Sequence, residues 1–139
     1  AYRHWGHDIT DQDSPLEAGL GFALKFDKAG GFIGREALLR QKESGIAKRL
    51  IQFGLRDPRP LLYHHEPIWL GDEIAGYVTS GSYGHSLGAA VGLGYVPMSL
   101  LPDFPELPGQ FEIEVAGVRV PAEASIRPMY DPAGQRVRN

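Results

Sequence analysis

The 139-residue chain contains no cysteine, which excludes a disulfide framework and a zinc site made of thiolates. The absence favours a reducing compartment only weakly, because secreted chains can also lack cysteine. No apolar run approaches the roughly 20 residues that a membrane-spanning helix needs. We therefore expect a soluble, intracellular protein with no membrane partner.

A basic excess is also lacking. The chain has 14 Lys and Arg residues against 17 Asp and Glu residues, a formal net charge of −3. Because a nucleic-acid surface needs clustered positive charge, we expect no nucleic-acid partner. With 42% hydrophobic residues, a chain of this length suits about one globular domain.

Glycine and proline, by contrast, are abundant, with 18 and 11 residues. They separate short apolar runs, which is typical of turn-rich antiparallel β structure. Residues 48–56 alternate, with Ile51, Phe53 and Leu55 on one side, and residues 111–115 alternate in the same way. Both segments are therefore predicted to be half-buried strands.

Two short turns divide the remaining strands. The Gly-Asp pair at 71–72 and the Ala-Gly pair at 116–117 each join two apolar segments and predict hairpins. The apolar run around Gly92 and Gly94 predicts a strand covered on both faces, with the glycines allowing bending or close backbone approach. Together these patterns predict a mostly β fold with five or six strands between residues 47 and 127, arranged as an antiparallel barrel.

The first 45 residues have a different pattern, which we call the lead-in. Ser14, Pro15 and Glu17 form the signature of a capping box, with proline at the first helical position. Because the apolar residues 19–26 follow at once, we expect a single helical turn leading into a strand.

Residues 32–45 predict the one convincing helix. Gly34 can serve as its N-cap, Ile33 and Leu38 can pack across that cap, and Gly45 can end it in the left-handed conformation. A three-turn helix and one or two strands cannot bury a core alone. We therefore expect the lead-in to pack against the barrel or against chain that precedes it.

The first residues contain a dense run of possible metal ligands: His4, His7, Asp8, Asp11 and Asp13. The run lacks both the helical His-x-x-x-His spacing of zinc enzymes and the glycine and final glutamate of a calcium loop. We therefore expect a polar loop and no metal site. Asp8 is a lone acid in this view, which favours a capping or ion-pairing role over catalysis.

Two further segments suggest chemistry without supporting it. The His-His-Glu run at 64–66 precedes Pro67 and fits a solvated turn better than a catalytic base. The glycine-rich residues 80–88 have neither the lysine of a phosphate loop nor a Gly-x-Ser-x-Gly elbow, so we expect a tight loop. We assign no catalytic residue.

Five separated blocks, in order, resemble the C-terminal third of the glycine-cleavage T-protein family of tetrahydrofolate-dependent aminomethyltransferases. The blocks are YRHWGHDI (2–9), SPLEAGLGFALKFDK (14–28), FIGREAL (32–38), EPIWLGDEIAGYVTSGSYGHSLGAAVGLGYV (66–96) and RPMYDPAGQRVR (127–138). The first and last blocks are similar to the version fused behind a flavin domain in sarcosine and dimethylglycine dehydrogenases. The resemblance covers nearly the whole chain.

The resemblance implies a division into two parts. Residues 1–45 would be the end of a truncated central folate-binding domain, with a short α+β character, and residues 46–139 would be the C-terminal aminomethyltransferase β-barrel, a jelly-roll-like barrel of six strands. The family's catalytic aspartate and pteridine-holding glutamate would lie before this chain. The implied partners are the protein's own N-terminal domains, and the implied location is the cytoplasm, or the mitochondrial matrix in a eukaryote.

The resemblance also implies a folate site at three aromatic residues, Tyr2, Phe22 and Tyr130. Phe22 departs from the family, which often has tryptophan there. Flat rings can stack on a pterin or benzoyl group, although core packing remains open for Tyr2 and Phe22 because most aromatic side chains are buried. The implied cofactors are tetrahydrofolate and, in a dehydrogenase, FAD in an absent N-terminal domain.

Two functions of different class follow. In the first, the chain is part of an enzyme that transfers a one-carbon unit from a demethylated secondary amine to tetrahydrofolate, giving 5,10-methylenetetrahydrofolate. In the alternative, the barrel is a non-catalytic module that closes the folate channel and contacts other domains, or it belongs to a glycine-cleavage T-protein. In either case we expect the chain alone to bind reduced folate weakly or not at all, and to turn over no amine.

Overall fold

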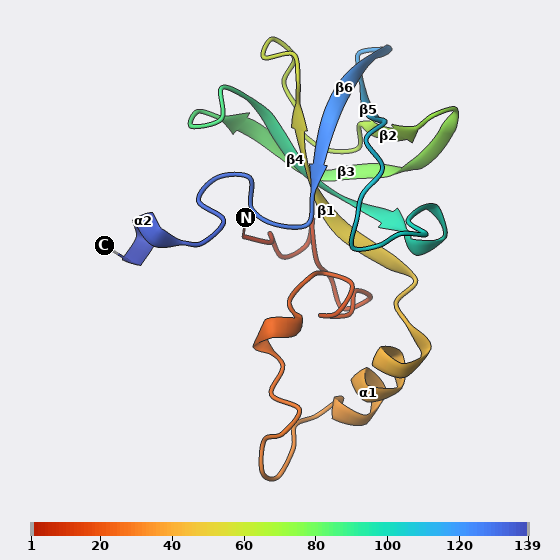
Figure 1. The fold of residues 1–139 in the computed structure, drawn as a ribbon, viewed down its shortest axis with the longest axis vertical. Coiled ribbons are helices and arrows are strands. Elements are labelled where there is room, and N and C mark those ends of the chain that lie inside the picture. Colours follow the sequence, from red (N-terminus) through yellow and green to blue (C-terminus); the bar gives the residue numbers. More distant parts are fainter. Residues whose placement is uncertain (1, 139) are drawn as a thin grey trace.

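Six strands form a closed antiparallel barrel in the computed structural model, which describes residues 2–138 (Figure 1). The strands are β1 (Lys48–Leu55), β2 (Pro67–Leu70), β3 (Glu73–Gly84), β4 (Ala89–Pro97), β5 (Phe111–Val115) and β6 (Val118–Ser125). Around the barrel their order is β1-β4-β3-β2-β5-β6, and β6 pairs with β1 to close it. The predicted six-stranded antiparallel barrel is confirmed.

The barrel core follows the alternation in the sequence. Ile51, Phe53 and Leu55 of β1 are buried, and Phe111 and Ile113 of β5 face them. The rings of Phe53 and Phe111 meet edge to face, with centroids 5.3 Å apart and planes at 72°, a favoured aromatic geometry. The strands therefore contribute apolar side chains to a single interior on every second residue.

Both predicted hairpin turns are present. Residues 71–72 connect β2 to β3, and Ala116 and Gly117 connect β5 to β6. The turn residues Ala116 and Gly117 have φ values of 51° and 79°, which is the positive-φ pair that matches the twist of a two-residue hairpin. Ala116 is unusual in this position, since a side chain disfavours that conformation.

The predicted close backbone approach occurs at Gly94 in β4. A Cβ atom at this position would lie 2.8 Å from the carbonyl oxygen of Tyr77 and would overlap Cδ1 of Ile68. β4 pairs with β1 on one side and β3 on the other, and the β3–β4 register shifts between Val78 and Ser80. Glycine at 94 thus lets the barrel wall fold tightly over its interior.

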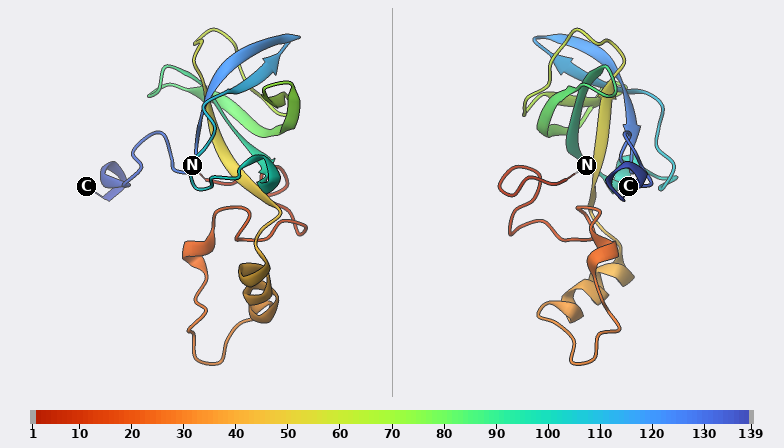
Figure 2. Two further views of the ribbon diagram at one scale, coloured as in Figure 1. Left: turned by 45° about the vertical axis from the view of Figure 1, so that its right-hand side comes forward. Right: turned by 90° about the vertical axis from the view of Figure 1, so that its left-hand side faces the viewer.

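The lead-in projects from one end of the barrel (Figures 1 and 2). Its elements are the short 3-10 helix η1 (Gly21–Ala23) and the helix α1 (Arg35–Ser44), while η2 (Met98–Leu100) follows β4 and α2 (Gln135–Arg138) lies near the C-terminus. In the described part of the chain, no helix is long and apolar enough to cross a membrane.

The helix prediction for residues 32–45 is confirmed, but its details are only partly right. Gly34 and Gly45 flank α1 as expected and both have positive φ, but Gly45, with φ 87° and ψ 165°, does not adopt the predicted left-handed helical conformation. The predicted packing of Ile33 on Leu38 is wrong, because the Ile33 side chain is fully exposed. No residue of α1 is buried, so the helix lies beside the barrel without joining its core.

The capping box is confirmed, and the strand predicted after it is wrong. The Glu17 N–H donates to Oγ of Ser14 at 3.1 Å, and the Ser14 N–H donates to Oε2 of Glu17 at 3.3 Å. Residues 21–23 then form η1 in place of a strand. A strand needs a hydrogen-bonded neighbour, and the strands within residues 2–138 all pair with one another in the barrel.

Candidate ligand site between the lead-in and the C-terminal segment

The lead-in is fastened to the barrel through the carboxylate of Asp8, which is 1% exposed. Its Oδ2 accepts the backbone N–H of His4 at 2.8 Å. Its Oδ1 accepts the hydroxyls of Thr79 and Ser80 on β3, at 2.5 and 2.8 Å. The Asp8 carbonyl accepts the hydroxyl of Tyr95 on β4 at 2.9 Å. Asp8 therefore caps its own loop and joins it to two strands.

A second polar contact supports the same junction. Nζ of Lys48 on β1 lies 2.6 Å from Oδ1 of Asp13 and 4.3 Å from the ring centre of Tyr95. Burial alone raises the pKa of Asp13, but hydrogen bonds from Lys48 and Thr10 outweigh it and leave that pKa below its ordinary value. Burial, followed by the neighbouring carboxylates of Asp13, Glu17 and Asp8, raises the pKa of the Tyr95 hydroxyl.

The histidines of the lead-in lie in an exposed loop. The rings of His4 and His7 stack with centroids 4.5 Å apart. The rings of His7 and His64 pack edge to face, with centroids 6.2 Å apart. Among residues 2–138 no group of three or more His, Asp or Glu side chains is arranged to hold a metal ion. His65 and Glu66 lie in the turn before β2, as predicted; there the backbone N–H of His65 donates to the carbonyl of Val78 at 2.6 Å.

Two of the three proposed folate residues, Tyr2 and Phe22, line one cavity of about 450 Å³. We call it the lead-in cavity. It lies between the start of the chain and the segment after β6, which run side by side in Figures 1 and 2. Its walls include Tyr2, Arg3, Phe22, Ile126, Arg127 and Pro128. Tyr2 is 95% exposed and Phe22 81% exposed, so neither serves as a core residue in this chain.

The third residue, Tyr130, lies outside the lead-in cavity. It lines a neighbouring hollow of about 300 Å³ with Gln52, His85 and Pro128. Its hydroxyl accepts a hydrogen bond from Nη1 of Arg136 at 2.9 Å. Pro128 borders both hollows, so Tyr130 is next to the cavity of Tyr2 and Phe22 but does not line it.

The sequence reasoning missed two residues of the lead-in cavity, Arg3 and Arg127. Both residues line the same cavity as Tyr2 and Phe22. They are 124 positions apart in the chain, and no local spacing relates them. Their neighbours Tyr2 and Pro128 stand in the first and last blocks of the family resemblance, which is the one signal that associates them.

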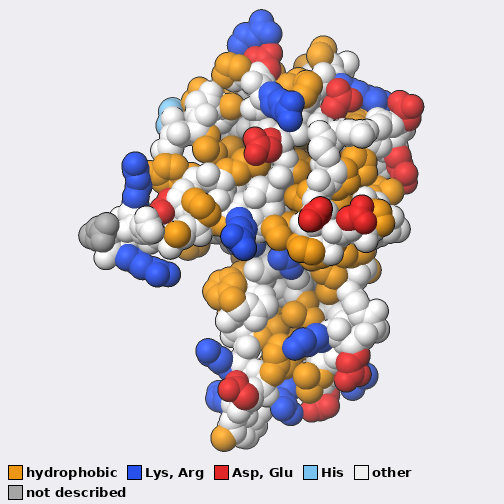
Figure 3. Space-filling model, in the orientation of Figure 1, with side chains coloured by type: hydrophobic (Ala, Val, Ile, Leu, Met, Phe, Trp, Pro, Cys, Tyr) orange, Lys and Arg blue, Asp and Glu red, His pale blue; other side chains and the backbone are white. Residues whose placement is uncertain are grey.

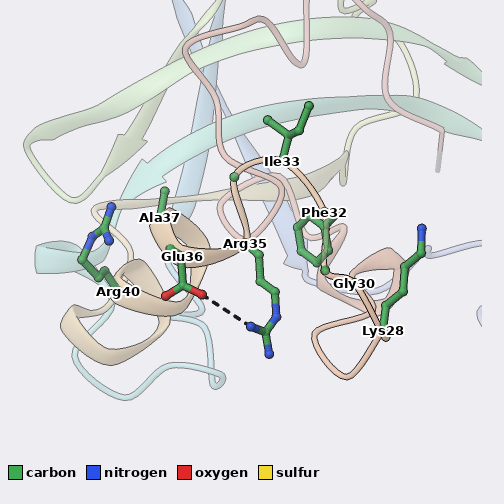
Figure 4. A pocket seen from close by; sticks show the side chains of 10 residues that line it. Lys28, Gly30, Phe32, Ile33, Arg35, Glu36, Ala37 and Arg40 are labelled. Carbon is green, nitrogen blue, oxygen red and sulfur yellow. Dashed lines mark hydrogen bonds and ion pairs between the residues drawn. The ribbon is translucent and has the colours of Figure 1, made fainter.

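A wider hollow of about 890 Å³ lies at the start of α1 (Figure 4). Lys28, Arg35 and Arg40 border it, but Figure 4 shows their side chains pointing in different directions. Arg35 is already engaged, because its Nε donates to the carbonyl of Phe26 at 2.8 Å and its Nη1 lies 3.4 Å from Glu36. This hollow therefore lacks the convergent groups of the lead-in cavity.

Comparison with known proteins agrees with the barrel. Residues 48–131 match the family "Glycine cleavage T-protein C-terminal barrel domain". The chain belongs to this T-protein barrel family. The match spans all six strands of the barrel and ends within the segment that borders the lead-in cavity.

Relatives of the T-protein barrel chain are named as an oxidase, a dehydrogenase and an aminomethyltransferase. It is 44% identical to 4-methylaminobutanoate oxidase (formaldehyde-forming) of Paenarthrobacter nicotinovorans, over 99% of this chain and 16% of the relative. It is 36% identical to the mitochondrial sarcosine dehydrogenase of Homo sapiens, over 99% of this chain and 15% of the relative. It is 39% identical to an aminomethyltransferase of Rubrobacter xylanophilus, over 94% of this chain and 34% of the relative. The chain thus spans about a third of the aminomethyltransferase and about a sixth of each of the other two relatives.

A solved structure has the same fold. The crystal structure of the glycine cleavage system aminomethyltransferase T from Bartonella henselae superposes with a TM-score of 0.73 at 25% identity. The superposition covers 89% of this chain and 34% of the solved chain. Most of this chain therefore corresponds to about a third of a larger protein.

Proposed function

We propose that this chain supplies one wall of a tetrahydrofolate site in a longer protein that transfers a one-carbon unit from a demethylated amine to tetrahydrofolate. The lead-in cavity is the observation that carries the proposal. It brings the rings of Tyr2 and Phe22 together with the segment before Tyr130 in one concave surface. A volume of about 450 Å³ lies within the range of small-molecule sites.

The groups in the cavity fit folate. A reduced folate combines flat rings with carboxylates, and the cavity presents exposed aromatic rings beside arginine side chains. Tyr2 and Phe22 would stack on the pterin or the benzoyl group, while Tyr130 would contact the ligand from the adjacent hollow. When bound, tetrahydrofolate accepts the one-carbon unit.

The kind of parent protein follows from the relatives. Two of them are named for oxidation of an N-methyl amine, and a third is named an aminomethyltransferase. We infer that the parent resembles a sarcosine or dimethylglycine dehydrogenase, with FAD bound by a domain that precedes residues 2–138. The protein's own N-terminal domains are then the partners of the lead-in, and a glycine-cleavage T-protein is the alternative parent.

The wall role is favoured over a catalytic role by the position of the acids. No Asp or Glu within residues 2–138 lines the lead-in cavity. Asp8, the acid of the first block, is buried, and its carboxylate accepts hydrogen bonds from His4, Thr79 and Ser80. A general acid or base must reach the reacting atoms, so we assign the chemistry to chain outside these residues.

Titration with 5-methyltetrahydrofolate, followed by NMR of the full chain, tests the proposal. We expect weak binding at millimolar ligand, with shifts concentrated at Tyr2 and Phe22, and loss of these shifts in Phe22→Ala. Tyr63→Ala is the matched control, because Tyr63 is an exposed aromatic residue in the loop before β2. Shifts confined to other surfaces would refute the site, and saturation at micromolar ligand would refute the single-wall role.

A further inference from the structure

Two arginine side chains, Arg3 and Arg49, meet at Gly19, a residue that lines the lead-in cavity. Nε of Arg3 donates to the carbonyl of Ala18 at 3.0 Å, and Nη1 of Arg49 donates to the carbonyl of Leu16 at 2.7 Å. Both carbonyls belong to the helical turn that the capping box begins. A Cβ atom at Gly19 would lie 2.9 Å from Nη2 of Arg3 and 3.0 Å from Nη2 of Arg49, so both guanidinium groups converge on this glycine.

The convergence concentrates positive charge. Burial and then the nearby Arg3 guanidinium lower the pKa of Arg49. Nε of Arg49 is buried without a hydrogen-bond partner in the described part of the chain. No carboxylate of residues 2–138 forms an ion pair with Arg49.

Arg127 lines the lead-in cavity as well as Arg3. Its backbone is fixed by Ser125, whose hydroxyl donates to the Arg127 carbonyl at 2.8 Å and accepts the Arg127 N–H at 3.1 Å. Its guanidinium has no ion-pair partner among residues 2–138. In Figure 3, Lys or Arg side chains and hydrophobic side chains lie close together where the barrel meets the lead-in.

We propose that Arg127, which lines the lead-in cavity together with Arg3, binds the carboxylates of the ligand and sets specificity for the glutamyl end of folate. This inference rests on the proposed folate site and assigns its polar end. Guanidinium groups bind carboxylates through paired, charge-assisted hydrogen bonds. Tyr2 and Phe22 line the same cavity as Arg127, so a benzoyl group attached to glutamate would have aromatic rings and a cation in one site.

Three ligands separate the parts of the site: p-aminobenzoyl-L-glutamate, 5-methyltetrahydrofolate and 6-methyltetrahydropterin, which has no glutamate. The full chain is titrated with each ligand and followed by NMR. The initial slope of the Phe22 chemical-shift change against ligand concentration scales with affinity. We expect Arg127→Gln to reduce the slope for both glutamate-bearing ligands roughly tenfold and to leave the pterin unchanged. Arg127→Lys should restore part of the loss.

Arg40→Gln is the charge-matched control, because Arg40 lies in the middle of α1 and borders a different hollow. It should leave all three slopes unchanged. Folate binding that is equally strong in Arg127→Gln and the wild type would overturn this inference and leave the proposed function intact. Absence of any shift at Tyr2 or Phe22 with all three ligands would overturn both. Equal losses in Arg127→Gln and Arg40→Gln would show a general charge effect and refute a specific role.

Discussion

Replacing Asp8 by alanine should be among the most destabilising single changes on the surface between the lead-in and the barrel. The substitution removes an acceptor from three donors: the His4 N–H and the hydroxyls of Thr79 and Ser80. A hydrogen bond to a charged group contributes about 1.5–3 kcal/mol, and a buried donor left without a partner adds to the loss. Thr79 retains a second acceptor, the Leu93 carbonyl at 3.1 Å.

With Thr79 discounted, two charge-assisted bonds remain, so Asp8→Ala should lower the free energy of unfolding by roughly 3–5 kcal/mol. Urea denaturation followed by circular dichroism measures this. With a slope of about 1–3 kcal/mol per molar urea, the midpoint should fall by at least about 1 M. Hydrogen exchange adds a local test, because the His4 N–H should exchange faster once its acceptor is gone.

Asp11→Ala is the matched control, since Asp11 is an exposed acid in the same loop. It should change the free energy of unfolding by less than about 0.5 kcal/mol. If Asp8→Ala and Asp11→Ala had the same midpoint, the carboxylate of Asp8 would not fasten the lead-in to the barrel. If exchange at His4 stayed slow in Asp8→Ala, the loop would owe its structure to other contacts.

Three further predictions concern charge, packing and a turn. Folding lowers the pKa of Asp13, so the ion pair between Asp13 and Lys48 contributes its full stabilisation at a pH well above 3.8. As the pH falls below 3.8, Asp13 becomes protonated and this contribution is lost. The wild type and Asp13→Asn should therefore differ in urea midpoint at neutral pH and have similar midpoints at acidic pH. Gly94→Ala should cost about 1–3 kcal/mol in thermal unfolding through overlap with Ile68, and a neutral result would contradict the packing. Ala116→Asn should stabilise the protein by about 1 kcal/mol, since asparagine tolerates positive φ, and a lower melting temperature would refute this.

The barrel was predictable because its information is local. Alternation around Phe53 and Phe111 identifies strands, and the pairs at 71–72 and 116–117 identify the hairpins between them. The order of strands around the barrel could not be read in this way, because pairing between β1 and β4 or β6 depends on residues far apart in the chain.

The lead-in was predicted less well, and the reason is physical. The capping box at Ser14 and the helix after Gly34 depend on neighbouring residues, and both are present. The strand expected at 19–26 and the packing of Ile33 depend on contacts with other chain segments, and neither formed. Local signals specify a turn or a helix, whereas burial requires something to pack against.

The candidate site was partly accessible from the sequence. Tyr2 and Phe22 were named from the family resemblance, and the structure places them in one cavity. The two arginines of the same cavity were not found, since Arg3 and Arg127 stand far apart in the sequence and share no motif. Asp8 was expected to cap or pair, and it caps its own loop while also binding β3, a contact across 71 positions that no local pattern reveals.

Closure of the barrel has a consequence for how such a unit travels between proteins. Each strand in the described chain has a neighbour on both sides, so none offers the open backbone edge through which sheets add further strands and grow into aggregates. A self-contained ring can be appended to unrelated neighbours without competing for their backbone hydrogen bonds. This chain, lead-in included, aligns with 34% of one relative and 15% of another, and the recognition surfaces of a closed barrel have to be built from side chains and loops.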